Sequence, residues 1–324
     1  MRLGALALGM LAVMGLARPS AAQDYPSRPI SIVLPLAAGS GLDVIARLYG
    51  DRLQQALGKP VVIENRPGAA MLIATQAVAS APPDGYSLLV ATSSAIAINP
   101  VLFKQINYDP VKGFAPISLY VKSPFILVVN PDLPVKNVAE LIALAKQRKD
   151  LNYSSPGVGV VPHLAMEYVK SRFGLDMAHV PYRSTPQSIL DIASGQVQLG
   201  FVEVGASLPL IQDGKLRVLA VSSATRLPIL PDAPTFAEAA NAPDFEAVSW
   251  HALLAPAHTP KPVLDRLHKE MKTIMADPEI KTKVANLGLI PVDTPSPEGI
   301  ESYFGGEREK WGALVRKLGL EGSQ

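Results

Sequence analysis

The stretch from Ile30 to Leu57 constrains the fold of this chain more than any other. It opens with a short β-branched apolar run, residues 30–36, which is typical of a buried parallel strand. It closes with apolar residues at helical spacing up to Leu57. Between these segments, Gly39 and Gly41 allow a tight turn, and Ser40 is a good helix N-cap residue. The stretch predicts a strand, a turn and a helix whose free N–H groups can bind an anion.

A single turn of this kind is ordinary, and its glycines match no nucleotide-binding motif. Val44 stands where a dinucleotide fingerprint has its third glycine, and no Gly-Lys-Ser/Thr follows. The pattern recurs, however, with strands expected at 61–63 and 86–91, a helix at about 71–81, and a short helix that stops near Asn99-Pro100. Three successive βα units bring their loops to one carboxyl edge of a parallel sheet, where ligands bind in open α/β sheets.

The chain of 324 residues is long enough for two domains. A strand-like stretch at 119–129, broken at Lys122-Ser-Pro, is the expected crossing into a second lobe. A second strand-like stretch, 246–255, is the expected return crossing. We therefore predict an α/β fold of two doubly wound domains joined by two strand crossings. Lobe 1 comprises residues 23–122 and 248–324, and lobe 2 comprises residues 123–247.

The elements expected after residue 130 alternate between strands and helices. The helix at 138–149 begins with a capping box of Asn137 and Glu140, and the helix after residue 184 begins with Thr185 as its N-cap. The remaining expected elements are strands at 151–154, 177–181, 198–202 and 216–222, helices at 163–172, after 203, and at 261–276, 278–287 and 296–318, and an irregular, proline-rich segment at 227–243. The cleft between two such lobes is typical of a hinge-closing binding protein.

The N-terminus has the features of a secretory signal peptide. Arg2 precedes an apolar run from Leu3 to Ala17, and Ser20 and Ala22 occupy the −3 and −1 positions of a cleavage site. We expect cleavage after about Ala22, and the mature protein in the periplasm. Loss of the two arginines in this segment lowers the formal net charge from +2 to 0. No cluster of lysine and arginine indicates nucleic acid or an anionic membrane as a partner.

The sequence contains no pattern typical of an enzyme or a metal site. It has no cysteine, no Gly-x-Ser-x-Gly elbow and no His-Glu-x-x-His, and its five histidines are scattered without ligand spacing. A hydrolase would have to assemble a catalytic group from Ser93 or Ser155 with His163. We expect no metal, no cofactor and no catalytic residue.

A series of short motifs in order resembles the Bug/TctC family of periplasmic solute-binding receptors, which serve tripartite tricarboxylate transporters. The resemblance covers essentially the whole mature chain, and the motifs are Tyr25-Pro-Ser-Arg-Pro-Ile, the loop 35–43, Glu64-Asn-Arg-Pro-Gly-Ala, Pro83-Asp-Gly-Tyr, Asn99-Pro100, Tyr108-Asp-Pro, Leu151-Asn-Tyr, His179-Val-Pro-Tyr, Gly214-Lys-Leu-Arg and Leu230-Pro-Asp-Ala-Pro-Thr. It implies a two-lobed periplasmic-binding-protein (Venus flytrap) fold, a small organic carboxylate as ligand, and the permease subunits of the transporter as partners. We expect a monomer.

The resemblance also indicates the ligand-binding loops. In the family, backbone N–H groups, hydroxyls and ordered waters hold the ligand carboxylate. The positions that correspond to these loops in this sequence, whether or not the residue type is the usual one, are Leu36, Ala38, Gly39, Ser40, Gly41 and Leu42 of the first loop, Ala70 and Met71 of the second, Thr92 and Ser93 of the third, and Gly157, Val158, Gly159, Val160 and Val161 in lobe 2. Asp43 and His163 are expected to order their loops, although Asp43 is also a possible direct contact.

Two charged residues near these loops are open to more than one interpretation. Arg183 either reaches an anion from the cleft rim or is a solvated charge there. A charged Glu203 facing the cleft would repel an anionic ligand unless it is protonated or turned onto a backbone amide. The other interpretation is that Glu203 has a structural role.

Several of these positions depart from the family pattern towards apolar side chains. Leu36, Leu42, Met71, Val158 and Val160 stand where polar, aromatic or glycine residues are usual in the family. An unpartnered polar ligand atom against such side chains costs about 1–3 kcal/mol. We therefore expect an aromatic or otherwise apolar-bodied mono- or dicarboxylate such as terephthalate, and citrate is less suited. A sensory module for carboxylates is the alternative to a transport receptor.

Overall fold

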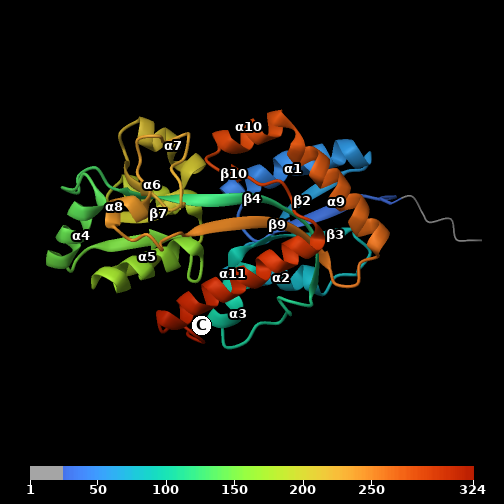
Figure 1. Ribbon diagram of the computed structural model, residues 1–324, viewed down its shortest axis with the longest axis horizontal. Helices are drawn as coiled ribbons and strands as arrows, with labels where there is room; N and C mark the ends of the chain where they lie inside the picture. The colour runs from blue at the N-terminus through green and yellow to red at the C-terminus, as the bar shows by residue number, and fades with distance from the viewer. Residues whose placement is uncertain (1–24) are drawn as a thin grey trace, which may run out of the picture.

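The computed structural model describes residues 25–324 as an elongated molecule of two lobes (Figure 1). The expected signal peptide, residues 1–22, lies outside the described residues. One continuous sheet of ten strands runs through the described part of the chain, in the order β2-β1-β3-β9-β4-β7-β5-β6, and β8 and β10 also pair with β4. Within residues 25–324, none of the helices has both the length and the apolar character needed to cross a bilayer.

The first three strands form the parallel part of lobe 1. β1 pairs in parallel with both β2 and β3. The elements are β1 (Ile30–Leu34), α1 (Gly41–Leu57), β2 (Val61–Asn65), the short helix η1 (Ala69–Met71), α2 (Leu72–Ala79), β3 (Ser87–Thr92), the π-helix η2 (Ser94–Ile98) and α3 (Asn99–Leu102). Because β1, β2 and β3 run the same way, their three loops meet at one edge, as the sequence predicts.

Two long antiparallel strands, β4 (Phe114–Val129) and β9 (Val248–Pro256), connect the lobes (Figure 1). β4 pairs with β9 as far as Pro124, and from Phe125 onward it pairs with β7 and β8 instead. This change of partner lies next to the proposed lobe boundary at residues 122 and 123.

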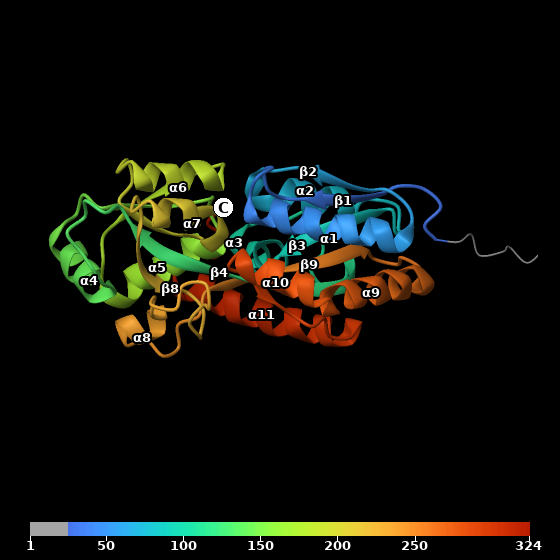
Figure 2. The ribbon, with the colours of Figure 1, turned by 90° about the horizontal axis from the view of Figure 1, so that it is seen from above.

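The second group of strands repeats the parallel arrangement. β5 pairs in parallel with both β6 and β7. The elements are α4 (Val138–Gln147), β5 (Asn152–Ser155), α5 (Val161–Phe173), β6 (Ala178–Pro181), α6 (Thr185–Ala193), β7 (Leu199–Glu203), α7 (Val204–Gln212), β8 (Arg217–Val221) and α8 (Phe236–Ala240). Figure 2 shows α6 and α7 facing α1 and β2 across the junction of the lobes.

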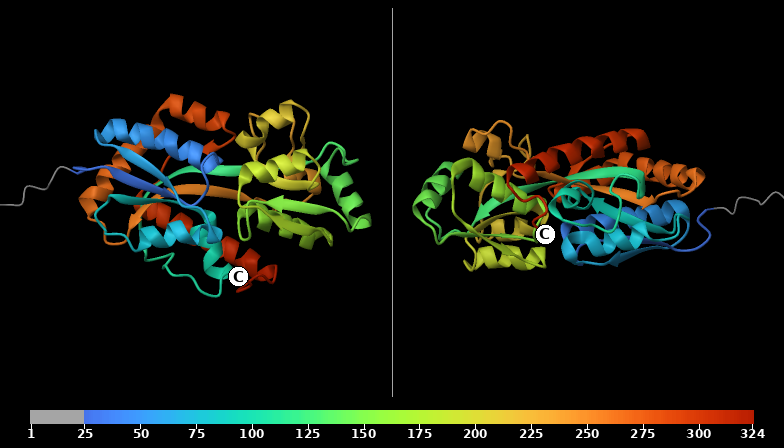
Figure 3. Two further views of the ribbon diagram at one scale, coloured as in Figure 1. Left: turned by 180° about the vertical axis from the view of Figure 1, so that it is seen from behind. Right: turned by 90° about the horizontal axis from the view of Figure 1, so that it is seen from below.

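The C-terminal elements cover lobe 1 and reach the junction. They are α9 (Lys261–Ala276), α10 (Pro278–Asn286), β10 (Ile290–Pro291) and α11 (Pro297–Lys317). Trp311 and Val315 of α11 pack in one apolar core with residues of lobe 2, together with Ile98 and Leu102. The last residues lie against α3, where Gly322 N–H donates to the carbonyl of Val101 at 3.1 Å, so the C-terminus lies beside the junction (Figure 3).

A buried carboxylate ties α11 to the crossing strand β9. One oxygen of Glu307, Oε2, accepts hydrogen bonds from the indole N–H groups of Trp250 and Trp311, both at 2.9 Å. The two tryptophans are 0% and 1% exposed, and they are the only two in the sequence. The ring of Phe304 stacks on Trp250 at 4.6 Å between centroids. Glu307 therefore joins a helix and a crossing strand through neutral donors.

The structure corrects four details of the expected elements. β4 is continuous through Lys122-Ser-Pro, because Pro124 is the last residue paired with β9 and lies where the strand changes partners. The helical segment after β3 does not stop at Asn99-Pro100; α3 begins there, with Pro100 in its first turn. Ser184 rather than Thr185 is the N-cap of α6. The proline-rich segment 227–243 contains α8.

Candidate functional site

The loop between β1 and α1 is held by side chains of its own lobe. Ser40 is the N-cap of α1, as expected, and its hydroxyl accepts the N–H of Asp43 at 3.3 Å. The carboxylate of Asp43 accepts the N–H of Gly39 at 3.0 Å, the amide of Asn65 at 3.0 Å and the guanidinium of Arg47 at 2.9 Å. Asp43 is 4% exposed. Its contacts therefore fix the conformation of the glycine turn.

The charge of Asp43 is stabilised in this position. Burial alone would raise the pKa of its carboxyl group, but the hydrogen bonds from Arg47, Gly39 and Asn65 outweigh burial and lower it. Asp43 is therefore ionised at neutral pH, and its contacts fit the interpretation that it orders the loop.

A contact between the lobes lies directly beside this loop. The N–H of Gly41, the first residue of α1, donates to Oε2 of Glu203 at 2.9 Å, although the two residues are 162 positions apart. A Cβ on Gly41 would lie 2.9 Å from the same oxygen, so glycine allows this close approach. Glu203 is turned onto a backbone amide, which is one of the possibilities left open by the sequence.

The environment of Glu203 opposes its charge. The side chain is partly buried, and burial raises the pKa of the carboxyl group, while the N–H of Gly41 acts against this shift. No ion pair involves Glu203 in the described part of the chain. Its carboxylate thus depends on the amino end of α1 for stabilisation.

A cavity of about 150 Å³ borders this contact between the lobes. Gly39, Gly41 and Val44 line it from α1 and its loop, and Glu203 with residues 204–206 lines it from α7. Ser123, Leu287 and Leu289 complete the wall. The cavity is therefore bounded by the amino ends of two helices from opposite lobes and by aliphatic side chains.

The second loop has a strained backbone. Ala70 and Met71 have φ values of 51° and 76°, in the left-handed region that favours glycine. The side chain of Asn99 holds the loop by donating to the carbonyl of Ala70 at 2.7 Å. Met71 is 6% exposed, and its sulfur accepts the hydroxyl of Thr92 at 3.1 Å. The structure thus brings Ala70, Met71 and Thr92 together.

Ser93 follows Thr92 and is fully buried. Its hydroxyl lies 2.8 Å from the hydroxyl of Ser249 on β9, so Ser93 links β3 to the crossing strand.

The lobe 2 loop packs against α3 of lobe 1. The N–H of Gly159 donates to Nδ1 of His163 at 3.3 Å, which ties the loop to the first turn of α5. A Cβ on Gly159 would lie 2.2 Å from a methyl group of Leu102, so the lobes touch closely here. Val158 packs against the same core, and Val160 is buried.

His163 belongs to a largely buried group of aromatic side chains. Its ring lies 4.3 Å from that of His179, and the ring of Tyr153 stacks on His179 at 4.9 Å. Burial lowers the pKa of His163 to about 4 and that of His179 to about 3. Both histidines are therefore neutral at physiological pH.

The hydrogen bonds of Ser155 do not form a catalytic pair. The hydroxyl of Ser155 donates to the carbonyl of Gly157 at 2.7 Å, and Nε2 of His179 lies 2.7 Å from the same hydroxyl oxygen. Because the serine proton points to a carbonyl, His179 must be the donor, and it has no role as a base towards Ser155. The histidine beside Ser155 is His179 rather than His163.

The other expected site residues are divided between the surface and the cores. Ala38 and Arg183 are exposed, and Leu36 and Gly157 are partly buried. The side chains of Leu42 and Val161 lie in the apolar cores, so only their backbone N–H groups can face a ligand. No group of three or more potential metal-ligating side chains occurs among the residues from 25 onward.

Sequence reasoning missed several residues that line the cavity. Ser123 comes from the expected crossing stretch, Leu287 is the last residue of an expected helix, and Leu289 follows that helix. The sequence offers one signal for this segment, the glycine at position 288. In the structure Gly288 has a φ of 74°, and a Cβ there would lie 2.4 Å from Val204. A residue with a side chain there would collide with α7.

Replacing Gly205 with alanine should push the lobes apart at this cavity. The new Cβ would lie 2.8 Å from the backbone oxygen of Leu287, whereas an ordinary contact begins at 3.4 Å. We expect the observed arrangement of the lobes to lose about 1–3 kcal/mol. Small-angle scattering of the unliganded protein should show a larger radius of gyration. Gly306→Ala in α11 is the matched control, because its Cβ would meet nothing within 4 Å. An unchanged scattering curve for Gly205→Ala would contradict the prediction.

Comparison with known proteins identifies the family. A family model described as "Tripartite tricarboxylate transporter family receptor" matches residues 45–320. A UPF0065 protein of Bordetella bronchiseptica is 38% identical over 310 residues, which are 95% of this chain and 88% of that protein. The structure of the periplasmic binding protein BugD is 34% identical with a TM-score of 0.85, and the match covers 92% of this chain and 99% of that one. An R. palustris protein, Rpa4515, solved with adipate, is 33% identical with a TM-score of 0.87 over 91% of this chain and 99% of its own.

These matches confirm the two-lobed α/β fold and the resemblance noted in the sequence. They also place the chain among binding proteins rather than enzymes. The chain belongs to the receptor (TctC) family of the tripartite tricarboxylate transporters and is a periplasmic solute-binding protein of the Bug type.

Proposed function

We propose that this protein captures a small organic carboxylate between its lobes and delivers it to the permease subunits of a tripartite tricarboxylate transporter. One observation carries the proposal: the cavity between the lobes is bounded by the amino ends of α1 and α7 and by aliphatic side chains. Helix amino ends favour an anion, and aliphatic walls favour an apolar body. Adipate, bound by the R. palustris relative, combines these two properties.

The amino end of α7 is the proposed seat for the ligand carboxylate in lobe 2. Glu203 is the N-cap of α7, yet its side chain makes no hydrogen bond to that helix because it reaches Gly41 instead. Residues 204–206, the first turn of α7, line the cavity, and no side chain caps the N–H groups of this turn. The loops that carry Gly39, Thr92 and Gly159 complete the proposed binding surface in a more open arrangement of the lobes.

The proposed ligand has a larger apolar body than citrate, such as an aromatic mono- or dicarboxylate. Val44, Leu287 and Leu289 offer no partner for hydroxyl groups. The present volume of about 150 Å³ is below the roughly 300 Å³ at which most ligand pockets begin, so the lobes must separate to admit a ring. Terephthalate is the compound we would test first.

A thermal-shift screen followed by calorimetry on the mature protein tests this function. A ligand present at about 100 times its dissociation constant adds about 2.7 kcal/mol to the stability. We expect benzoate or terephthalate analogues to stabilise the protein more than citrate does. Tight citrate binding without any response to aromatic carboxylates would contradict the proposed ligand class, and no response to any carboxylate would contradict the function.

Carboxylate sensing for a signalling partner remains the second candidate function, since the same cleft serves both roles. A gene for a tripartite permease next to the gene for this protein would favour transport, and a gene for a sensor kinase would favour sensing. We also propose a monomeric mature protein that begins after about Ala22, which N-terminal sequencing and sedimentation would check.

A further inference from the structure

Three amide groups in the turn at the start of α1 are already bonded within the protein. The N–H of Gly41 donates to Glu203, the N–H of Gly39 donates to Asp43, and the N–H of Ser40 donates to the carbonyl of Ala37 at 3.3 Å. A carboxylate therefore occupies the amino end of α1, and it belongs to the opposite lobe of the same chain. A ligand carboxylate that approached α1 would have to displace Glu203.

Displacement would leave two like charges in one small space. The cavity measures about 150 Å³, and Glu203 is part of its wall. The other charged group at this end, Asp43, is also acidic and is paired with Arg47. No lysine, arginine or histidine is among the residues that line the cavity. A ligand carboxylate that took the place of Glu203 at α1 would meet repulsion from Asp43 and from the displaced Glu203, without a neutralising cation in the cavity wall.

A hydrogen-bond donor is the chemical group that fits beside Glu203. The carboxylate has two oxygens, of which the N–H of Gly41 engages only Oε2. An ammonium or amide group of a ligand can donate to the remaining acceptor sites, and such charge-assisted hydrogen bonds are the strong ones. The α1 end of the cavity, where Glu203 lies, thus favours a hydrogen-bond donor of the ligand. The amino end of α7 favours the ligand carboxylate.

We propose that Glu203 is a specificity-determining residue, which selects ligands with one carboxylate and a hydrogen-bond donor at the other end over dicarboxylates. The inference rests on the proposed function, because it assumes that a carboxylate binds between the lobes, and it narrows the ligand class. Terephthalate is then a weaker ligand than its monoamide, and adipate is weaker than 6-aminohexanoate.

Isothermal calorimetry on the mature protein with these two matched pairs tests the inference. For the wild type we expect the amide or amine to bind at least tenfold more tightly than the dicarboxylate, which corresponds to about 1.4 kcal/mol. Glu203→Gln keeps the shape and one acceptor oxygen for Gly41 but removes the charge. In this variant we expect the ratio to move at least tenfold towards the dicarboxylate. Glu309→Gln is the matched control, because Glu309 is exposed on α11.

The outcomes separate the inference from the proposed function. If the wild type binds terephthalate as tightly as its monoamide and adipate as tightly as 6-aminohexanoate, the inference is overturned and the proposed function as a carboxylate receptor stands. A ratio that Glu203→Gln leaves unchanged overturns it as well. A failure of every carboxylate to bind, including benzoate, contradicts the proposed function and removes the inference with it.

Discussion

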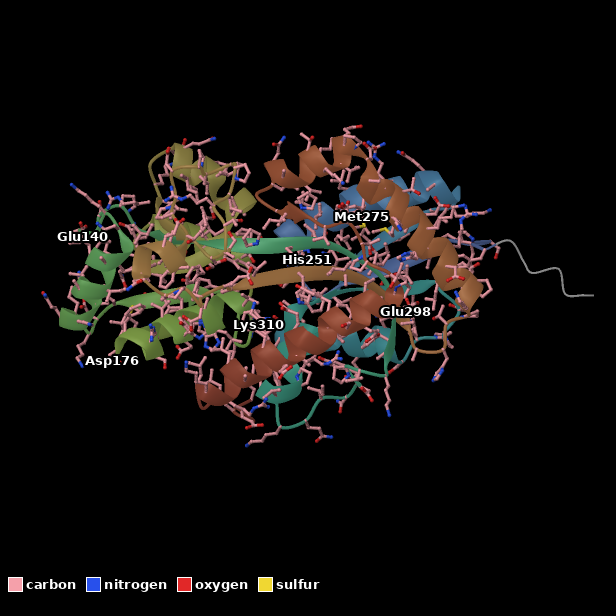
Figure 4. The ribbon with its side chains drawn as sticks, in the orientation of Figure 1. Glu140, Asp176, His251, Met275, Glu298 and Lys310 are labelled. Carbon is pink, nitrogen blue, oxygen red and sulfur yellow. The ribbon has the colours of Figure 1, made fainter. Side chains whose placement is uncertain are left out.

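Lowering the pH from 7 to 5 is expected to reduce the free energy of unfolding by about 6 kcal/mol, close to 2 kcal/mol for each of three buried or partly buried histidines. Burial lowers the pKa of His163 to about 4 and those of His179 and His251 to about 3. His251 lies on β9 in the middle of the molecule (Figure 4), and its Nδ1 has no hydrogen-bond partner among the described residues.

The sign follows from proton binding in the two states. In the unfolded chain a histidine titrates near pH 6.5, so at pH 5 it carries a proton that the folded state does not accept. The unfolded state therefore binds more protons than the folded state between about pH 4 and 6.5. Stability is complete above this range and is lost as the pH falls through 6.5, whereas it should hardly change between pH 7 and 8.

Urea unfolding followed by circular dichroism at half-unit steps of pH would measure this loss. Glu203 and Glu301 act in the opposite direction, because burial raises the pKa of both carboxyl groups. The decisive comparison is therefore the triple replacement of His163, His179 and His251 by glutamine or asparagine, which should flatten the profile above pH 5. A wild-type profile that is already flat between pH 7 and 5 would contradict the assignment of neutral buried histidines.

Replacing Glu307 with alanine is expected to destabilise the protein by about 4 kcal/mol. The substitution leaves the indole N–H groups of Trp250 and Trp311 buried without an acceptor, at about 1–3 kcal/mol each, and opens a cavity beside them. Glu307→Gln keeps an oxygen that can accept both bonds, so its loss should be about 1 kcal/mol.

Urea unfolding would measure both changes, and tryptophan fluorescence would report on their cause. Because the protein has two tryptophans and both donate to Glu307, the whole emission spectrum reports on this group. Glu309→Ala on the exposed side of the same helix is the control and should unfold like the wild type. A Glu307→Ala variant as stable as this control would mean that the indole groups find other acceptors.

Local sequence patterns predicted most of the fold. The helix expected at 261–276 has the bounds of α9. Its signals are local, because Pro260 lies directly before its first residue and its apolar residues follow helical spacing. The missed helix α8 had a visible signal, since Thr235 and Glu238 form a capping box. The continuity of β4 through Pro124 had no such signal, because it depends on β9 and β7 as partners from distant parts of the chain.

The sequence predicted which loops form the candidate site, but not how the loops of the two lobes contact each other. The glycines and Ser40 identified the turn before α1, since their conformational preferences are local. The contact of Gly41 with Glu203 depends on how two lobes meet, which no local pattern states. The same is true of Leu287 and Leu289, whose place in the cavity wall follows from the packing of the segment after α10 against α7.

The pairing of β3 with β9 has a consequence for the order of folding. Thr92 lies opposite His251, so β3 gains its second neighbour only after 159 further residues (251 − 92) have followed it. The strands β5 to β8, by contrast, have their neighbours within residues 114–221. Closing a long loop before its contacts form is slow. As the chain emerges from the export channel, we expect lobe 2 to become compact first, and lobe 1 to close around it when β9 arrives.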